Sequence, residues 1–199
     1  MKKIILSCVF LCAGIISQSQ SFMHGAGVGI FVPHNSVMGT SISGTLTYSP
    51  RFNFMENDGF SLSAGIPINV GFSGSYSLEY NSYYGTEESN TFGFMLNAPL
   101  MINLNVGAGS TTDTESRFGF FVGGGFGLHY GDLGTYVTDE YGYEYYDSKY
   151  KAVYGPAGNA GIRIGVGRQQ KNIEIRLSYM KCSDETKTSI YGVNTLFNF

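Results

Sequence analysis

The sequence predicts an all-β protein, an eight-stranded antiparallel up-and-down transmembrane β-barrel, from three observations. Apolar residues alternate with small or polar ones over long stretches, as they do along strands with two different faces. Only 27 of the 199 residues are charged, about half the share that is typical of soluble domains. Glycine contributes 28 residues, and Phe and Tyr together contribute 30. The net charge of −3 also argues against nucleic acid as a partner.

The first 21 residues are predicted to be a signal peptide, which leaves residues 22–199 as the barrel domain. Lys2 and Lys3 precede an apolar run at residues 4–16, and small polar residues follow this run. The run is too short to cross a bilayer as a helix. Cleavage removes two of the three cysteines, so the mature chain is expected to lack an internal disulfide.

The alternation is clearest in three segments, which begin at Phe60, Phe92 and Phe118. In each segment the even positions are mostly apolar, whereas the odd positions are mostly Ser, Asn, Gly, Pro or Met. The segments run for 13 to 15 residues, more than the 9–11 that a tilted membrane strand needs. We expect eight strands, at residues 23–33, 39–54, 59–74, 91–106, 117–130, 152–167, 172–181 and 188–199.

Charges are missing where a soluble sheet would need them. No charged residue lies between Lys3 and Arg51, although the wet face of a soluble antiparallel sheet normally carries charge. No run of 18 apolar residues follows the predicted signal peptide, so strands rather than helices are expected to cross the membrane.

The predicted connections differ in length between the two ends of the barrel. Membrane barrels have short periplasmic turns and longer outside loops. We therefore assign residues 55–58, 107–116 and 168–171 to the periplasmic end. The outside connections are then residues 34–38, 75–90, 131–151 and 182–187.

Aromatic residues on the predicted lipid-facing positions separate by type, as expected for girdles at the two membrane interfaces. The predicted periplasmic girdle consists of Phe54, Phe60, Phe118, Phe197 and Phe199. The predicted outer girdle consists of Tyr76, Tyr130, Tyr154, Tyr179 and Tyr191.

The inward positions are mostly small or neutral polar residues, with a few charges among them. If the turn after Gly167 is tight, Arg163 lies opposite Arg176, with Glu174 one pair below. Because buried arginines require a carboxylate, we predict a lumen network of these three residues. Structural filling of the narrow lumen is the simplest role for it, and a selective pore is the alternative.

The last strand places Tyr191, Val193, Phe197 and Phe199 on one face and ends on phenylalanine. This pattern resembles the recognition signal of the outer-membrane barrel-assembly machinery. Residues 22–199 as a whole resemble the small outer-membrane β-barrel family of the OmpA membrane domain and OmpX. The resemblance implies a bacterial outer-membrane location, with membrane lipid and the assembly machinery as partners.

Tyrosine and acidic residues are concentrated in the two longest outside loops. Tyrosine offers a large amphipathic contact area at a low entropic cost, so binding surfaces use it often. We predict a structural, adhesive or surface-binding role, with a surface protein or glycan as the ligand; the alternative is that these loops are only solvated extensions of the strands. The candidate binding residues are Tyr80, Tyr83, Tyr84, Tyr136, Tyr141, Tyr143, Tyr145 and Tyr146.

Other functions have weaker support from the sequence. A small porin or transport accessory is the main alternative, and a soluble lipocalin-like barrel would need charges on its outer face. A lipid-modifying enzyme would need a nucleophile or carboxylate beside His24, His34 or His129, and no catalytic motif accompanies them. The acidic loop does not match the spacing of a calcium-binding EF-hand loop. We therefore expect no enzyme activity, no cofactor and no metal site.

Overall fold

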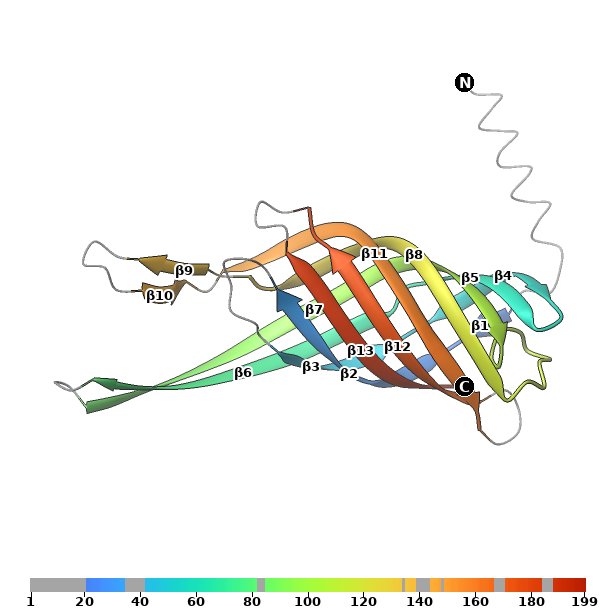
Figure 1. Cartoon of the computed structure of the whole chain (residues 1–199), viewed down its shortest axis with the longest axis horizontal. Coiled ribbons are helices and arrows are strands. Elements are labelled where there is room, and N and C mark those ends of the chain that lie inside the picture. The colour runs from blue at the N-terminus through green and yellow to red at the C-terminus, as the bar shows by residue number, and fades with distance from the viewer. Residues whose placement is uncertain are drawn as a thin grey trace, which may run out of the picture.

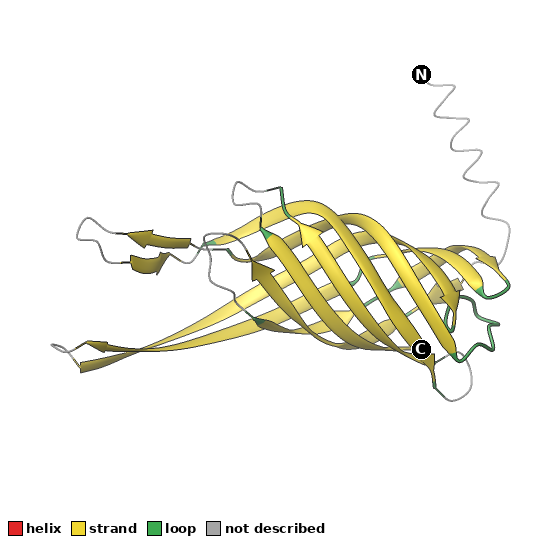
Figure 2. Ribbon diagram, viewed as in Figure 1, coloured by secondary structure: helices red, strands yellow, loops and turns green. Residues whose placement is uncertain are grey.

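The computed structural model is an all-β barrel (Figures 1 and 2). It describes residues 21–34, 42–81, 85–133, 135–138, 144–147, 149–166, 171–183 and 188–199. The predicted signal peptide therefore lies outside the described residues, apart from Ser21. The part of the chain that is described contains no helix long and apolar enough to cross a membrane.

Thirteen strand segments build the barrel and one outer hairpin. The first half of the barrel contains β1 (Ser21–Met23), β2 (Gly25–His34), β3 (Ser43–Tyr48), β4 (Arg51–Asn57), β5 (Phe60–Gly65), β6 (Ile68–Asn81) and β7 (Gly85–Gly107). The second half contains β8 (Phe118–Asp132), β11 (Tyr150–Gly165), β12 (Asn172–Lys181) and β13 (Ser189–Asn198). The hairpin consists of β9 (Thr135–Thr138) and β10 (Glu144–Asp147).

These segments make eight barrel strands, because three pairs continue each other: β1 with β2, β3 with β4, and β5 with β6. Each strand is antiparallel to its neighbours in sequence, and the last strand pairs with the first through β13 and β2. The barrel is therefore closed, and closure removes the unpaired edges that a bilayer does not tolerate. The prediction of an eight-stranded antiparallel barrel is confirmed.

Two of the predicted strands are interrupted near prolines. Pro50 follows the end of β3, and Pro67 lies between β5 and β6. Proline has no N–H to donate to a neighbouring strand, so the ladder is interrupted at these points. The neighbours stay the same, because β3 pairs with β2 and β6, and β4, which continues it, pairs with their continuations β1 and β5.

A β-bulge in β4 corrects one residue of the predicted periplasmic girdle. The register with β5 shifts between Asn53 and Met55, so Phe54 is left at the irregularity. Phe54 is half-buried, while Phe52 and Met55 on either side of it are exposed. An extra residue in one strand reverses the alternation beyond it, and the sequence pattern did not reveal this bulge.

The rest of the alternation is as predicted, and it produces an apolar belt around the barrel. Among the described residues, Phe118, Phe197 and Phe199 are exposed at the end with the short turns. The exposed tyrosines near the opposite end are Tyr130, Tyr150, Tyr154, Tyr179 and Tyr191. Phe60 is half-buried, and the side chain of Tyr76 lies outside the described residues.

One tyrosine departs from the predicted separation by type. Tyr48 is exposed near the periplasmic end, where its hydroxyl lies 2.7 Å from Nδ1 of His24. The ring of His24 also stacks on Phe199 at a centroid distance of 6.0 Å. The Phe and Tyr residues are thus biased toward opposite ends without being strictly separated.

The inner face is polar in the half near the short turns and apolar near the other end. Its buried polar side chains are mostly Ser, Thr and Asn. The apolar part is a cluster of buried side chains from five barrel strands and the loops next to them: Phe31, Met95, Leu133, Val153, Met180, Cys182 and Ile190. The sequence analysis predicted small polar filling and did not predict this apolar layer.

Candidate functional sites in the lumen and on the outer hairpins

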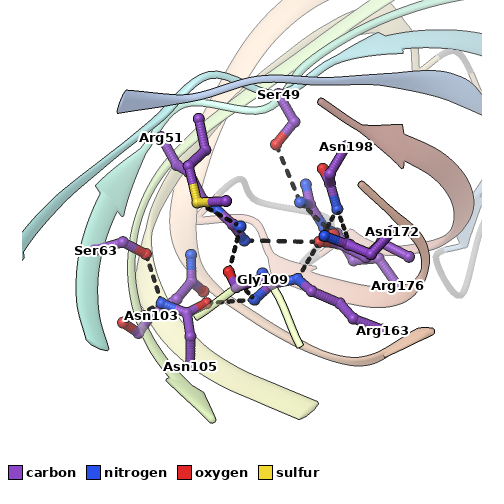
Figure 3. A network of polar contacts seen from close by, with 12 residues as sticks. Ser49, Arg51, Ser63, Asn103, Asn105, Gly109, Arg163, Asn172, Arg176 and Asn198 are labelled. Carbon is purple, nitrogen blue, oxygen red and sulfur yellow. Dashed lines mark hydrogen bonds and ion pairs between the residues drawn. The ribbon is translucent and has the colours of Figure 1, made fainter. Parts of the chain in front are cut away.

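Glu174 is the centre of a charged network in the lumen (Figure 3). Its carboxylate is fully buried and accepts hydrogen bonds from Nε of Arg163 at 2.7 Å and Nε of Arg176 at 2.8 Å. Asn198 donates to the same carboxylate at 3.1 Å. The structure therefore brings together the three residues that the sequence grouped as a lumen network.

The predicted pairing within this network is wrong by two residues along β12. Arg163 lies opposite Glu174, and Arg176 lies opposite Gly161. The N–H of Val166 donates to the carbonyl of Lys171, so the partner of Lys171 lies two residues earlier in the chain than predicted. A shift of two residues preserves the inward orientation of all three side chains.

Gly161 has no side chain, which leaves room for the ring of Phe121 beside the two arginines. The ring of Phe121 lies over Gly161, where an added Cβ would come within 2.6 Å of a ring carbon. The guanidinium carbon of Arg163 is 4.4 Å from the centroid of this ring, and that of Arg176 is 5.6 Å from it. Phe121 thus supplies a cation–π surface for both arginines.

A third arginine belongs to the network, and the sequence analysis missed it. Arg51 is buried, and its Nη1 lies 3.9 Å from the Glu174 carboxylate. Its Nη2 donates to the carbonyl of Gly109 at 2.6 Å. Arg51 occupies an odd position in a strand whose even positions face lipid, so the same alternation could have predicted its inward orientation.

The connection between β7 and β8 closes the periplasmic mouth of the lumen. Ala108, Ser110 and Thr111 are buried, although they belong to a turn. The carbonyl of Ser110 accepts a hydrogen bond from Asn53, and that of Gly109 accepts from Arg51 and Arg163. The start of this loop therefore folds into the barrel and satisfies donors of the network.

The lumen between these layers contains little free space. A cavity of about 20 Å³ is lined by Phe31, Asn97, Arg176 and Met180, among other residues. This volume suits one or two water molecules. An eight-stranded barrel is just wide enough for its own side chains to fill, and the side chains described here do fill it.

The two longest outside connections form β-ribbons that extend beyond the barrel, at the end opposite the C-terminus (Figure 1). In the β6–β7 ribbon, Tyr80 pairs with Thr86 and Glu79 pairs with Glu87. In the β9–β10 hairpin, Tyr146 pairs with Tyr136 and Tyr145 pairs with Val137. Four of the predicted binding residues lie outside the described residues: Tyr83, Tyr84, Tyr141 and Tyr143.

The C-terminal strand presents its predicted face to the outside of the barrel. Tyr191, Val193, Phe197 and Phe199 are all exposed, while the residues between them are buried, with the exception of Thr195, which continues the exposed face. β13 pairs with β12 on one side and with β2 on the other. In the folded barrel this strand is therefore the closing seam.

The three histidines lie apart from one another. His24 is near the periplasmic end, His34 ends β2 on the opposite side, and His129 is buried in the lumen. In the described part of the chain, no group of three or more His, Cys, Asp or Glu side chains is arranged to hold a metal ion.

Solved structures of other proteins have the same fold as this chain. Neisserial surface protein A matches with a TM-score of 0.55 and 13% identity, covering 91% of this chain and 98% of its own. Ail, the attachment invasion locus protein of Yersinia pestis, matches with a TM-score of 0.52 and 10% identity. The match covers 92% of this chain and 100% of Ail, whose structure was determined in complex with the heparin analogue sucrose octasulfate. The sequence matches no family model and no curated protein.

These matches show that the chain has the fold of small outer-membrane barrels of the OmpA and OmpX type. The apolar belt agrees with this fold, because exposed side chains such as Phe118, Leu100 and Phe126 would be costly in water and are favourable in lipid. Fold and belt together assign the protein to a bacterial outer membrane.

Proposed function

We propose that this protein is a non-enzymatic surface-binding protein, in which the barrel is a filled membrane anchor and the two outer ribbons bind the partner. The observation that carries the proposal is the contrast between the two ends of the molecule. The periplasmic turns are short or folded into the lumen, whereas two ribbons project beyond the outer end. A barrel that needed only to insert in the membrane would not require these projections.

The composition of the ribbons supports a binding role. Residues 75–90 and 131–151 together contain ten of the 15 tyrosines, eight acidic residues and only two basic ones. Tyrosine makes contacts at a low entropic cost, and a surface rich in one charge selects partners of the opposite charge. A protein with a basic, partly apolar surface suits these ribbons best.

The related folds support a role at the cell surface in general terms. One of them is named a surface protein and another an attachment protein. The Yersinia protein was crystallised with a sulfated heparin analogue. The acidic ribbons of this chain would repel such a polyanion, so we expect a partner of different chemistry.

The proposal can be tested with outer-membrane vesicles that carry the full chain. The vesicles would be passed over immobilised extracellular-matrix proteins and over heparin, with vesicles lacking the protein as the blank. We expect retention on at least one matrix protein and none on heparin. Replacing residues 75–90 or 135–147 by a short turn should reduce retention at least tenfold.

A second kind of variant shows whether lost retention reflects lost binding or a misfolded barrel. Replacing three or four tyrosines of one ribbon by serine keeps the charge and the length of the chain, and it should weaken binding without changing the heat-modifiable migration of the barrel. Retention that is unchanged in both ribbon-shortened variants would contradict the proposal. Absence of retention on every surface, including heparin, would favour a purely structural role.

We also propose that the barrel-assembly machinery recognises the C-terminal strand. The alternating exposed face of β13, which includes Tyr191 and Phe197, supports this assignment. Deleting Phe199 should lower the amount of folded barrel in the outer membrane several-fold. Replacing Phe118, an exposed aromatic residue on β8, by serine is the matched control and should have a smaller effect.

A further inference from the structure

Two neighbouring side chains in the lumen have hydrogen-bonding atoms without a partner in the described part of the chain. Asn159 on β11 lies directly opposite Ser178 on β12. Oδ1 of Asn159 and Oγ of Ser178 are both buried, and neither is hydrogen-bonded to a described residue, including the other of the pair. Because an unsatisfied buried polar atom is costly, a further group that bonds to both atoms is expected here.

Both side chains line the same cavity, the one of about 20 Å³ described above. This cavity lies between the two layers of the lumen. Arg176 lines it from the charged network, whereas Phe31 and Ile190 are among the residues that line it from the apolar cluster. The two atoms without a partner therefore border a small space between the layers.

Other polar groups on the wall of this cavity bond mostly to their neighbours. Oδ1 of Asn69 accepts a hydrogen bond from Oγ1 of Thr47 at 2.8 Å, and Nδ2 of Asn194 donates to the same Oγ1 at 2.9 Å. Nδ2 of Asn97 donates to the sulfur of Met180 at 3.7 Å, and a thioether is a weak acceptor. Asn97 can therefore still donate to a molecule in the cavity.

We propose that the cavity is a binding site for a water molecule, which donates one hydrogen bond to Oδ1 of Asn159 and forms a second with Oγ of Ser178. A buried water needs two to four polar partners and about 10–15 Å³ of accessible volume, and this site offers both. The ligand must be neutral, because Arg176 on the cavity wall would repel a cation and the Asn159 oxygen would repel an anion. The water would connect the charged network to the apolar layer.

Crystals of the full, unaltered chain would test the site directly. We expect ordered density in the cavity within hydrogen-bond distance of Oδ1 of Asn159 and Oγ of Ser178. The same crystals pressurised with xenon should show no xenon at this position, because xenon enters dry apolar cavities. A direct hydrogen bond between Asn159 and Ser178 with no water beside it, or xenon in the cavity, would refute the site.

A double-mutant cycle tests whether the water stabilises the folded barrel. Asn159→Leu and Ser178→Ala each remove one partner of the same water. The shift of the urea unfolding midpoint in the double variant should therefore be smaller than the sum of the two single shifts.

The matched cycle combines Ser178→Ala with Asn57→Leu, which makes the same amide substitution at an exposed position at the end of β4. These two shifts should add, because the sites share no partner. Additive shifts in both cycles would overturn the proposal. If Asn159→Leu does not fold, the crystals of the unaltered chain decide the question, and neither result depends on the function of the outer ribbons.

Discussion

At the scale of single residues, the stability of the barrel depends on the buried carboxylate of Glu174. It is the shared acceptor of two arginines, and a third lies 3.9 Å away. Removing one member of a buried ion pair leaves a charge without compensation, which costs far more than the pair contributes. We therefore expect Glu174→Gln to destabilise the barrel by about 3–5 kcal/mol.

The fraction of folded barrel in a urea titration would measure this effect. Glu115→Gln, at an exposed position of the periplasmic loop, removes the same charge and should change the free energy of unfolding by less than about 0.5 kcal/mol. If both variants unfolded at the same urea concentration, Glu174 could not be the centre of the network.

Gly109 provides a second prediction at this scale. Its φ of +65° is a left-handed conformation, and a Cβ at this position would lie 2.5 Å from Nδ2 of Asn172. Gly109→Ala should therefore cost about 1–3 kcal/mol of stability. Gly124→Ala is a suitable control, because a Cβ there has no atom within 4 Å and faces outward. Equal thermal midpoints for the two variants would mean that the turn at residues 108–111 does not require glycine at position 109.

The sequence predicted three of the four charged residues that meet in the lumen, but not Arg51 and not how the three pair. Strand alternation was enough to orient Arg163, Arg176 and Glu174 inward, because orientation repeats every two residues. The pairing depends on how many residues the turn contains, and this turn closes at Val166 and Lys171. Turn geometry depends on the packing of both strands, which the alternation pattern does not encode.

At the scale of strands and connections, topology was the best predicted feature. Strands with one lipid face and one lumen face carry a strong pattern, so the pattern predicted all eight strands. Two of their bounds were wrong, because β6 runs seven residues past the predicted end at residue 74 and β7 begins six residues before the predicted start at residue 91. The breaks at Pro50 and Pro67 and the bulge near Phe54 were not predicted, since they depend on the local hydrogen bonding between two strands, which the alternation pattern does not contain. The plug formed by residues 108–111 was also missed, because nothing in a short polar turn indicates that it folds inward.

The assignment of the ribbons to the cell surface gives a prediction at this scale. In a Cys182→Ser background, we expect a cysteine at Ser77 in β6 to react with a membrane-impermeant maleimide on intact cells. A cysteine at Ser116, on the periplasmic loop, should react only after the outer membrane is permeabilised. If Ser116→Cys were labelled on intact cells, the barrel would have the opposite orientation to the one proposed.

At the scale of the whole molecule, the barrel has an apolar belt outside and a closed interior. The belt predicts that a charge at mid-strand impairs insertion. Leu100, exposed and paired with Phe126, is such a position. Leu100→Arg should destabilise the barrel in lipid vesicles by about 2–4 kcal/mol. Asn57→Arg, at the exposed end of β4, should have little effect, and equal effects would mean that the belt does not face lipid.

The closed interior gives a prediction about transport. The lumen is blocked by an apolar layer, a charged network and the inward turn at residues 108–111. We expect no steady single-channel conductance when the purified barrel is inserted into planar bilayers. Discrete, long-lived openings in the unaltered protein would instead favour the small-porin alternative.

The lumen contacts also constrain the order in which the protein can fold. Arg176 donates to Ser49 across 127 residues of sequence, and Asn194 donates to Thr47 across 147. Thr47 and Ser49, in the first third of the chain, therefore lack these contacts until the last two strands have been synthesised and delivered. A chain interrupted before β12 would have a lumen arginine without its carboxylate. The arginines of the lumen can therefore reach their shared carboxylate only after β12 has been made, because Glu174 belongs to that strand.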